Sequence, residues 1–473
     1  MQLSLKPGTP IGTAQRALLL WLMFMLAACG SMAAHAQGVG EVTYAYGLTS
    51  MQRPGEDPRF VQKGDKLNQG DVVSTSNRGF AVITLNDGTK MTLRPNTSFA
   101  VDKFSHGAGD ESAVFRLLRG GVRAFTGLIS KRNPQGMQLT ARAATMGIRG
   151  TSFDVRSCEG DCAEELKTAR KKEGAPPDVV VARLAVVVGT VSVVAASGQT
   201  RPASKGTPLV NGDAVRTEKG SHAVIAFRDQ SKITVTAGSE FKLENVKFTD
   251  AKADSGNFVV RVVRGGARAL TGLLARNQPQ NVQVRMLTSV VGVRGTGIDA
   301  MFGLDCVAPN QCAQSAFVHT WEGVVALEEG GRSLLIPTGQ TGVFNPKFQR
   351  LTLIEQRPQF MIDEPAPRPD TVPVDFENLF GTTRVDGAPP GLFAFVRDGH
   401  IEFFGRVGSI DLGPGESSYL PDGADIPQRL AETPSFLLND PYPLPEQFNE
   451  QTVRLLDVLN LGGRPGDVIC EVQ

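Results

Sequence analysis

A segment of 40 residues occurs twice in this chain, and this duplication constrains the fold more than any other feature. Residues 116–155 align with residues 261–300 without a gap, and 17 positions are identical. Further upstream, "LNQGDVVST" at residues 67–75 matches "LVNGDAVRT" at residues 209–217. Because internal repeats of this kind are copies of one structural unit, the sequence predicts two domains of the same fold.

A shorter echo follows the second copy. Residues 397–420 resemble residues 321–344 at an offset of 76, so the closing segment of the second copy recurs in the C-terminal region. Leucines at helical spacing predict a helix at residues 447–460. We predict a signal peptide, a first repeat, a polar linker, a second repeat, a proline-rich linker and an acidic C-terminal module, at residues 1–36, 37–162, 163–178, 179–356, 357–373 and 374–473.

Both copies have the patterns of β structure. "FAVITLNDGTKMTL" at residues 80–93 places two alternating runs around an Asn-Asp-Gly turn, which is typical of a β-hairpin. Residues 179–196 are rich in valine, which favours buried strands. We therefore expect a mainly β fold with two tandem β-rich domains and a small mixed C-terminal module. The domains are expected to be β-rolls or solenoid-like, with a sandwich as the alternative.

The N-terminus is typical of an exported protein. Basic residues precede an apolar run at residues 17–26, which is too short to span a membrane comfortably. "AHA" at residues 34–36 fits cleavage by a signal peptidase, whereas "LAAC" fits a lipobox that would leave Cys29 lipidated. We expect a protein of the periplasm or cell envelope, with an outer-membrane lipoprotein as the alternative, and no transmembrane helix in the mature chain.

Four of the six cysteines form two close pairs, each shortly after a copy of the repeated segment. The pairs are Cys158 with Cys162 and Cys306 with Cys312, and Cys470 is left over. Exported proteins keep such pairs oxidised, so we predict two disulfides. The alternative, a zinc site, normally needs four Cys or His ligands, and no second pair or histidine lies nearby in the sequence.

The order of several short motifs resembles the FecR domain, the periplasmic part of the ferric-citrate regulators. The series is Gly70-Asp71, Asp87-Gly88-Thr89, Asn96, Gly121, Gly150-Thr151-Ser152-Phe153, Glu322-Gly323 and Gly339-Gln340. The resemblance covers residues 38–353 and implies two exported, β-rich recognition domains. In the family's regulators this domain receives a signal from a TonB-dependent receptor and passes it to an N-terminal anti-sigma domain. Only 16 residues precede the apolar run here, so no anti-sigma domain fits.

No motif nominates a catalytic site. The five histidines do not pair with Ser or Cys in a recognisable nucleophile motif. Paired carboxylates of a glycosidase can come from distant strands, which keeps a glycan-processing enzyme as an alternative. We predict a protein that is not an enzyme and has no catalytic residue, cofactor or metal. The repeated glycines and threonines are expected to mark backbone turns or close packing: Gly147, Gly150, Thr151, Gly292, Gly295 and Thr296.

Basic residues concentrate in the repeats. Residues 116–149 hold seven Lys and Arg and no acidic residue, and residues 261–294 hold six and none. From Glu355 onward there are 20 acidic and 8 basic residues, so the alternative to an external anionic partner is docking of the acidic C-terminal region. The candidates for bidentate contacts to an anionic partner are Arg116, Arg119, Arg123, Arg261, Arg264 and Arg268.

The net charge of +1 gives no reason to expect a nucleic-acid partner. We therefore predict an exported, non-enzymatic recognition or scaffold module that binds an anionic envelope glycan or a protein partner. The alternative is a signalling component that engages a TonB-dependent receptor or a separate regulator.

Overall fold

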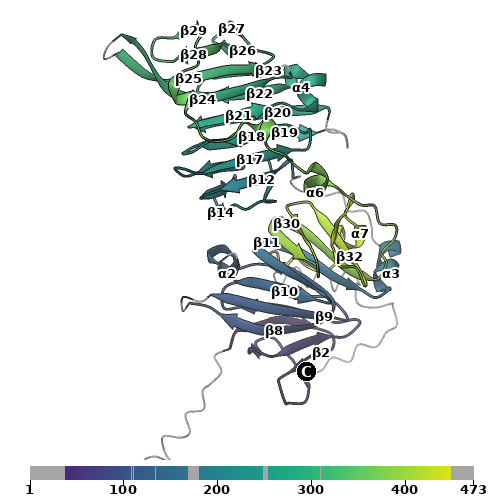
Figure 1. Cartoon of the computed structure of the whole chain (residues 1–473). Helices are drawn as coiled ribbons and strands as arrows, with labels where there is room; N and C mark the ends of the chain where they lie inside the picture. Colours follow the sequence, from purple (N-terminus) through teal and green to yellow (C-terminus); the bar gives the residue numbers. More distant parts are fainter. Residues whose placement is uncertain are drawn as a thin grey trace, which may run out of the picture. The chain divides into compact units, whose positions relative to one another are not determined.

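The computed structural model describes most of the chain between residues 38 and 448 (Figure 1). The predicted signal peptide with Cys29, all but the first two residues of the predicted helix at 447–460, and Cys470 lie outside the described residues. Among those described, no helix is both long enough and apolar enough to cross a membrane. The described ranges are 38–107, 109, 111–133, 135–168, 180–248, 254–293, 295–308 and 311–448.

The second repeat forms two nine-stranded sheets that share one hydrophobic core. The first sheet has the order β15 (Pro208–Leu209), β12 (Ala182–Val188), β17 (His222–Phe227), β18 (Lys232–Val235), β21 (Gly266–Leu270), β24 (Gly297–Ala308), β25 (Gln311–Glu322), β28 (Thr341–Asn345), β29 (Arg350–Ile354). The second has the order β14 (Thr200–Pro202), β13 (Val191–Val194), β16 (Ala214–Thr217), β19 (Glu240–Phe248), β20 (Gly256–Arg264), β22 (Val282–Met286), β23 (Ser289–Val293), β26 (Val324–Glu329), β27 (Arg332–Pro337).

Alternation of side chains determines which face of each strand enters this core. In β22, Val282, Val284 and Met286 are buried, whereas Gln283 and Arg285 between them are partly exposed. Successive side chains of a strand point to opposite faces, so a strand that alternates in this way covers the core with one face only. The chain passes repeatedly between the two sheets, which confirms the predicted mainly β fold and combines the layers of a sandwich with the chain path of a roll.

The first repeat uses the same strand order in one continuous 15-stranded sheet. Its first layer contains β4 (Lys66–Leu67), β1 (Gly40–Tyr46), β6 (Phe80–Leu85), β7 (Lys90–Leu93), β9 (Ser112–Phe125), β11 (Ala144–Cys158), β30 (Gly391–Phe404), β32 (Ser417–Pro421), β33 (Gln428–Arg429). Its second layer contains β3 (Arg59–Phe60), β2 (Thr49–Gln52), β5 (Val72–Thr75), β8 (Ser98–Ser105), β10 (Met137–Ala141), β31 (Ser409–Leu412) and the other halves of β9, β11 and β30.

The long strand β9 passes from one layer to the other near Gly120. That residue has φ 81°, a left-handed conformation that side-chain-bearing residues rarely adopt. A Cβ at this position would lie 2.6 Å from the carbonyl oxygen of Asn96. Gly265 has φ 71° at the matching point of the second repeat, between β20 and β21. The Gly-Gly pair in each copy therefore marks the crossing between layers.

The C-terminal strands complete the sheet of the first repeat. Asp154 pairs with Phe395 and Ile148 pairs with Ile401 along β11 and β30. Figure 1 shows β30 and β32, in yellow, beside the blue strand β11. The matching pairs of the second repeat, at offsets of 145 and 76, are Asp299 with His319 and Val293 with Val325.

The echo at residues 397–420 therefore supplies to the first repeat the strands that follow β24 in the second. Leu392, Ala394, Ile401 and Phe403 lie in the same hydrophobic core as the strands of residues 40–158. The sequence places the first repeat in one continuous segment, 37–162, whereas this strand pairing adds residues 391–429 to its sheet. The second repeat is an insertion between these two parts.

Short helices and turns join the strands. Residues 128–132 and 273–277 form single turns at equivalent places of the two repeats. Residues 161–168, which span the predicted boundary between the first repeat and the polar linker, are helical. The helices are α2 (Leu128–Arg132), α3 (Asp161–Thr168), α4 (Leu273–Asn277), α5 (Gln359–Ile362), α6 (Phe376–Phe380) and α7 (Ser435–Leu438), with 3-10 turns at η2 (Pro279–Asn281) and η3 (Pro369–Thr371).

The dependence of the first repeat on β30 can be tested with two phenylalanines of that strand. Phe403 is fully buried, and Phe403→Ala should lower the free energy of unfolding by about 3–5 kcal/mol. Phe404 is 38% exposed, and Phe404→Ala should cost less than about 1 kcal/mol. Hydrogen exchange should show faster exchange in β9–β11 of the Phe403 variant; unchanged protection there would contradict the completion of this sheet by β30.

Candidate functional site

Each repeat carries a buried arginine–aspartate pair on the outer face of its first layer. Arg123 Nε lies 2.9 Å from Asp154 Oδ1, and their side chains are 4% and 3% exposed. At the matching positions, Arg268 Nε lies 3.5 Å from Asp299 Oδ1, with exposures of 7% and 0%. The two residues of each pair are opposite neighbours on adjacent strands. Residues on either side of them face the core, so a covering segment must bury these outward-facing charges.

The covering segments are two stretches with the same sequence pattern, which we call the proline straps. The second strap is residues 357–369, "RPQFMIDEPAPRP", and the first strap is residues 433–445, "TPSFLLNDPYPLP". They align without a gap at the offset of 76 already seen for the echo. In each, a proline precedes a single helical turn, α5 or α7, and an acidic residue precedes a Pro-x-Pro-x-Pro run.

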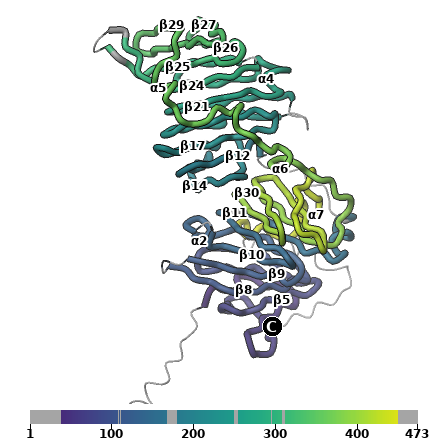
Figure 2. The backbone as a smooth tube through the Cα atoms, in the orientation of Figure 1, coloured from purple at the N-terminus to yellow at the C-terminus, as the bar shows by residue number. Residues whose placement is uncertain are grey.

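The second strap is held mainly through its backbone carbonyls. Arg268 donates from Nη1 to the carbonyl oxygen of Ala366 at 2.6 Å. Arg357 Nη2 donates to the carbonyl oxygen of Met361 at 2.6 Å and to Asp299 Oδ2 at 2.8 Å. Figure 2 shows this green segment after α5 as it crosses the strands of the second repeat. The buried aspartate thus orients Arg268, which binds the strap, and pairs with Arg357, the first residue of the strap itself.

The first strap is held at the same positions. Arg123 donates from Nη1 to the carbonyl oxygen of Tyr442, the counterpart of Ala366. Arg397 donates from Nη2 to the carbonyl oxygen of Leu437 at 3.0 Å and to Asp154 Oδ2 at 2.6 Å. Arg397 lies at the place that Trp321 takes in the second repeat, where the indole Nε1 donates to Asp299 Oδ1 at 3.2 Å.

The first strap forms further ion pairs with its repeat through Asp440. Arg94 Nε lies 2.6 Å from Asp440 Oδ2, and Arg94 Nη2 lies 2.9 Å from Glu165 Oε2. Burial opposes the charge on Arg94, but the nearby Asp440 and Glu165 carboxylates hold its pKa above the ordinary value. The Arg94 guanidinium lies 5.2 Å from the Tyr442 ring centre, and burial raises the pKa of Tyr442 to about 12. The strap residue Tyr442 therefore stays neutral beside a permanently charged arginine.

In the second repeat the buried aspartate is likewise paired with two arginines, Arg268 and Arg357. Burial raises the pKa of Asp299, against the attraction of Arg268 and Arg357. The Arg368 guanidinium of the second strap lies 4.0 Å from the Trp321 ring centre, a cation–π contact. This contact supports the second strap where the first uses ion pairs.

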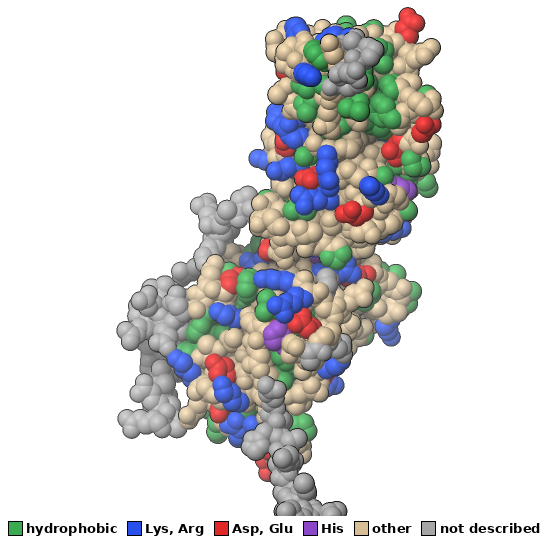
Figure 3. Space-filling view, turned by 90° about the vertical axis from the view of Figure 1, so that its left-hand side faces the viewer, with side chains coloured by type: hydrophobic (Ala, Val, Ile, Leu, Met, Phe, Trp, Pro, Cys, Tyr) green, Lys and Arg blue, Asp and Glu red, His purple; other side chains and the backbone are tan. Residues whose placement is uncertain are grey.

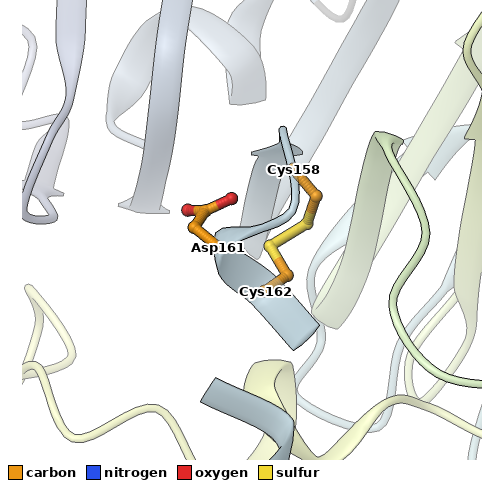
Figure 4. Close-up of side chains that lie close together, drawn as sticks. All are labelled: Cys158, Asp161 and Cys162. Carbon is orange, nitrogen blue, oxygen red and sulfur yellow. A yellow bond between two sulfur atoms is a disulfide. The ribbon is translucent and has the colours of Figure 1, made fainter. Parts of the chain in front are cut away.

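The disulfide Cys158–Cys162 lies beside this site. Cys158 ends β11 and Cys162 lies in the first turn of α3 (Figure 4). Both cysteines are fully buried, and their bonded sulfurs are not available as metal ligands. The bridge confirms the first predicted cysteine pair. It fixes α3, whose Glu165 reaches Arg94 and whose Asp161 lies 3.2 Å from Arg156.

Cys306 is also disulfide-bonded. The backbone pairing of β24 with β25 places it opposite Cys312, but the Cys312 side chain lies outside the described residues. The pairing of these two cysteines stays a prediction.

The arginines predicted to bind an anionic partner divide into two groups. Arg123 and Arg268 are buried under the straps. Arg116, Arg119, Arg261 and Arg264 lie in the second layer of each repeat and are partly or largely exposed. Arg116 pairs with Asp102 at 2.7 Å, and Arg261 pairs with Glu244 at the matching position. Figure 3 shows one face on which Lys and Arg side chains gather, with Asp and Glu among them.

The glycine–threonine motifs have the same backbone conformation in the two copies. Gly150 and Gly295 have φ of 60° and 59°. Gly147 and Gly292 lie in extended strands, β11 and β23. The Thr296 backbone N–H donates to Thr271 Oγ1 at 2.8 Å, whereas the Thr151 side chain lies outside the described residues. These positions shape the backbone within β11 of the first repeat, and at the end of β23 and just before β24 in the second.

The family of these repeats follows from their sequence. The model of the family described as FecR protein matches residues 71–168 and 213–325. The chain carries two FecR domains. The FecR resemblance found in the motif order is thereby confirmed, and one matched segment falls largely or wholly within each repeat.

Other comparisons add little to this. Among curated proteins, none matches this chain. Two solved structures, at 1.65 and 2.50 Å resolution, of a proposed anti-sigma factor from Parabacteroides distasonis resemble it with 15% identity and a TM-score of 0.25. The match covers 32% of this chain and 62% of that one. A likeness of this size carries no argument about function.

The straps were not recognised from the sequence as a repeated element. The sequence predicts the proline-rich stretch at 357–373 to be a linker. It predicts Arg123 and Arg268 to contact an anionic partner or the acidic C-terminal region. The offset of 76 continues without a gap from the echo at 397–420 into residues 433–445. That continuation was the available signal that the two proline-rich stretches share a binding mode.

The arginine–strap contact can be tested on β9. Arg123→Met removes a charge that is 4% exposed, and it should lower the free energy of unfolding by about 3 kcal/mol or more. Amide exchange at residues 440–446 should become faster, because the strap loses the guanidinium that donates to its carbonyl oxygen at Tyr442. Arg116→Met on the same strand removes an arginine that is 52% exposed, and it should cost about 1 kcal/mol or less. Equal losses in the two variants would contradict the assigned role.

The disulfide should support the strap through α3. The double variant Cys158→Ala/Cys162→Ala should lower the free energy of unfolding by about 2 kcal/mol, the chain-entropy value for so short a loop. Exchange should increase in α3 and in the first strap. Glu159→Ala changes an exposed residue of the same loop and should leave both unaffected. If exchange in the strap does not respond to loss of the disulfide, α3 does not couple the two.

Proposed function

We propose that this protein is an exported, non-enzymatic recognition or scaffold module of the cell envelope. In this proposal the second layer of its second FecR domain binds an anionic glycan or an acidic protein. The disulfide Cys158–Cys162 supports an oxidising compartment, since such bridges persist outside the cytosol. The FecR match supports a role in recognition or signalling rather than catalysis.

The observation that carries the proposal is an excess of positive charge on four neighbouring strands of one sheet. Each of its two glutamates is shared by two arginines: Glu240 lies 3.0 Å from Arg216 and 3.8 Å from Arg264. Glu244 pairs with Arg261 and Arg285 in the same way. One carboxylate cannot neutralise two guanidiniums, so the face keeps a net positive charge. The cationic residues of β16, β19, β20 and β22 are Arg216, Lys242, Lys247, Arg261, Arg264 and Arg285.

The corresponding face of the first repeat is less charged. Ser74 and Ser98 stand where the second repeat has Arg216 and Glu240, and they share a hydrogen bond of 3.1 Å. Thr140 stands where the second repeat has Arg285. The Arg116–Asp102 pair is the part of the arrangement that both copies share, so we assign the anionic partner to the second repeat.

A binding experiment on isolated anionic envelope glycans tests this assignment. The variant Arg261→Ala/Arg264→Ala should bind about tenfold more weakly at low salt, because it loses charge-assisted contacts. Binding of the unmodified protein should weaken as salt is raised, since exposed charges are screened. Arg276→Ala/Lys347→Ala makes the same change in charge on α4 and on the turn between β28 and β29 of the other sheet, and this variant should bind normally. Binding that is independent of salt would overturn the proposal.

The FecR match favours a second candidate, a signalling component that engages a TonB-dependent receptor or a separate regulator. Cross-linking in intact envelopes distinguishes the two candidates. Recovery of an outer-membrane receptor or an inner-membrane regulatory chain would support signalling. Recovery of glycan alone, released by salt, would support the scaffold.

A further inference from the structure

The two straps show one mode of peptide binding at two places in the molecule. In each, an arginine that an aspartate holds in place donates to the carbonyl oxygen of the residue between two prolines, Tyr442 or Ala366. The carbonyl of the helical turn also accepts from an arginine on the same aspartate, but the donors differ. At Leu437 the donor is Arg397 of β30, whereas at Met361 it is Arg357 of the strap itself. One arginine contact that is made at the same place to two different segments is what a binding site with a sequence preference would produce.

Backbone recognition explains why the side chains of the straps can differ. Tyrosine and alanine occupy the same place, because the arginine contacts the carbonyl and not the side chain. The prolines hold the segment extended in advance, which reduces the conformational entropy lost on binding. They also lack N–H groups that would otherwise be buried without partners. The preferred ligand is therefore an extended, proline-rich segment.

The first repeat adds a preference for an acidic ligand. Around its strap it has four arginines, whereas the second repeat has one arginine and three uncharged residues at the same positions. Asp440, directly before the first proline, pairs with two of them, Arg94 at 2.6 Å and Arg123 at 3.7 Å. In the second strap, Glu364 accepts from the backbone N–H of Ala366 within its own segment. The four positions are Arg94, Arg123, Arg156 and Arg397 in the first repeat and Thr236, Arg268, Met301 and Trp321 in the second.

We propose that the site around Arg123 and Asp154 is a peptide-binding site for extended acid–Pro–x–Pro–x–Pro segments. Residues 439–445 fill it within the chain, and a segment of this class from a protein partner occupies it when the strap is displaced. The site lies on the first layer of the first repeat, whereas the arginines proposed to bind an anionic partner lie on the second layer of the second repeat. The two proposals therefore stand or fall separately.

The test uses the full chain with its own strap weakened and a labelled synthetic peptide with the sequence of residues 433–447. The strap is weakened by Asp440→Ser, Pro441→Ser, Tyr442→Gly and Pro443→Ser. Fluorescence anisotropy should show the peptide binding this variant at least tenfold more tightly than it binds the unmodified protein. In the unmodified protein the tethered strap competes at an effective concentration of about millimolar.

Matched variants show whether binding uses the assigned contacts. Adding Arg123→Met to the weakened chain should reduce peptide affinity at least tenfold, whereas adding Arg116→Met on the same strand should not. A peptide in which the three prolines of the run are alanines should bind at least tenfold more weakly. A weakened chain that keeps its far-UV circular dichroism and fails to bind the peptide would overturn the proposal, as would binding that survives Arg123→Met.

A second measurement covers the case in which the weakened chain does not fold. Millimolar peptide added to the unmodified protein should accelerate amide exchange at residues 440–446, because it competes for the same site. The alanine-substituted peptide is the control and should have no effect. If the intact peptide leaves exchange in the strap unchanged, the strap is a fixed part of the fold and the site accepts no external segment.

Discussion

A buried carboxylate, Asp154 in the first repeat and Asp299 in the second, organises most of what surrounds it. A charge removed from water is strongly destabilising unless it is paired and hydrogen-bonded. Asp154 is paired with Arg123 from β9, its neighbour in the sheet, and with Arg397 from β30, a strand more than 200 residues later in the sequence. Both arginines bind the strap in turn. One aspartate therefore links four separate segments of the chain, and none of them can leave without exposing a charge or burying one unpaired.

The second repeat is inserted at a point where the strand β11 would otherwise form an unpaired edge of the sheet. A long strand with unpaired backbone groups at the edge of a sheet invites association with other chains. In the second repeat β25 follows β24 directly and covers that edge. In the first repeat the chain leaves through α3 and the whole second repeat before β30 returns to pair along β11 from Thr145 to Cys158. The register of this late pairing is that of the second repeat, so the insertion leaves the fold of the first repeat complete.

Much of the fold could be predicted from the sequence, because repetition and side-chain alternation are local signals. The duplication, the β structure and the echo at 397–420 all follow from them. The completion of the first repeat by this echo does not follow from local signals. Sequence similarity identifies the strands of the echo, but not the strand with which they pair. Arg116 and Arg123 illustrate the same limit. Both lie on β9, and both side chains point away from the hydrophobic core. The first strap, which is remote in the sequence, covers Arg123 and leaves Arg116 exposed.

The divergence of the two strap sites follows from how the straps are held. Contacts to carbonyl oxygens impose few requirements on side chains, so the residues around the aspartate could change while the strap stayed in place. Trp321 with its stacked Arg368 replaces an arginine-based arrangement in the second repeat. The first repeat instead gathers arginines, whose charges need Asp440 and Glu165 as partners. A site that balances its charge with a residue of the strap itself depends on an acidic ligand. The second site has uncharged residues at three of the four arginine positions and does not.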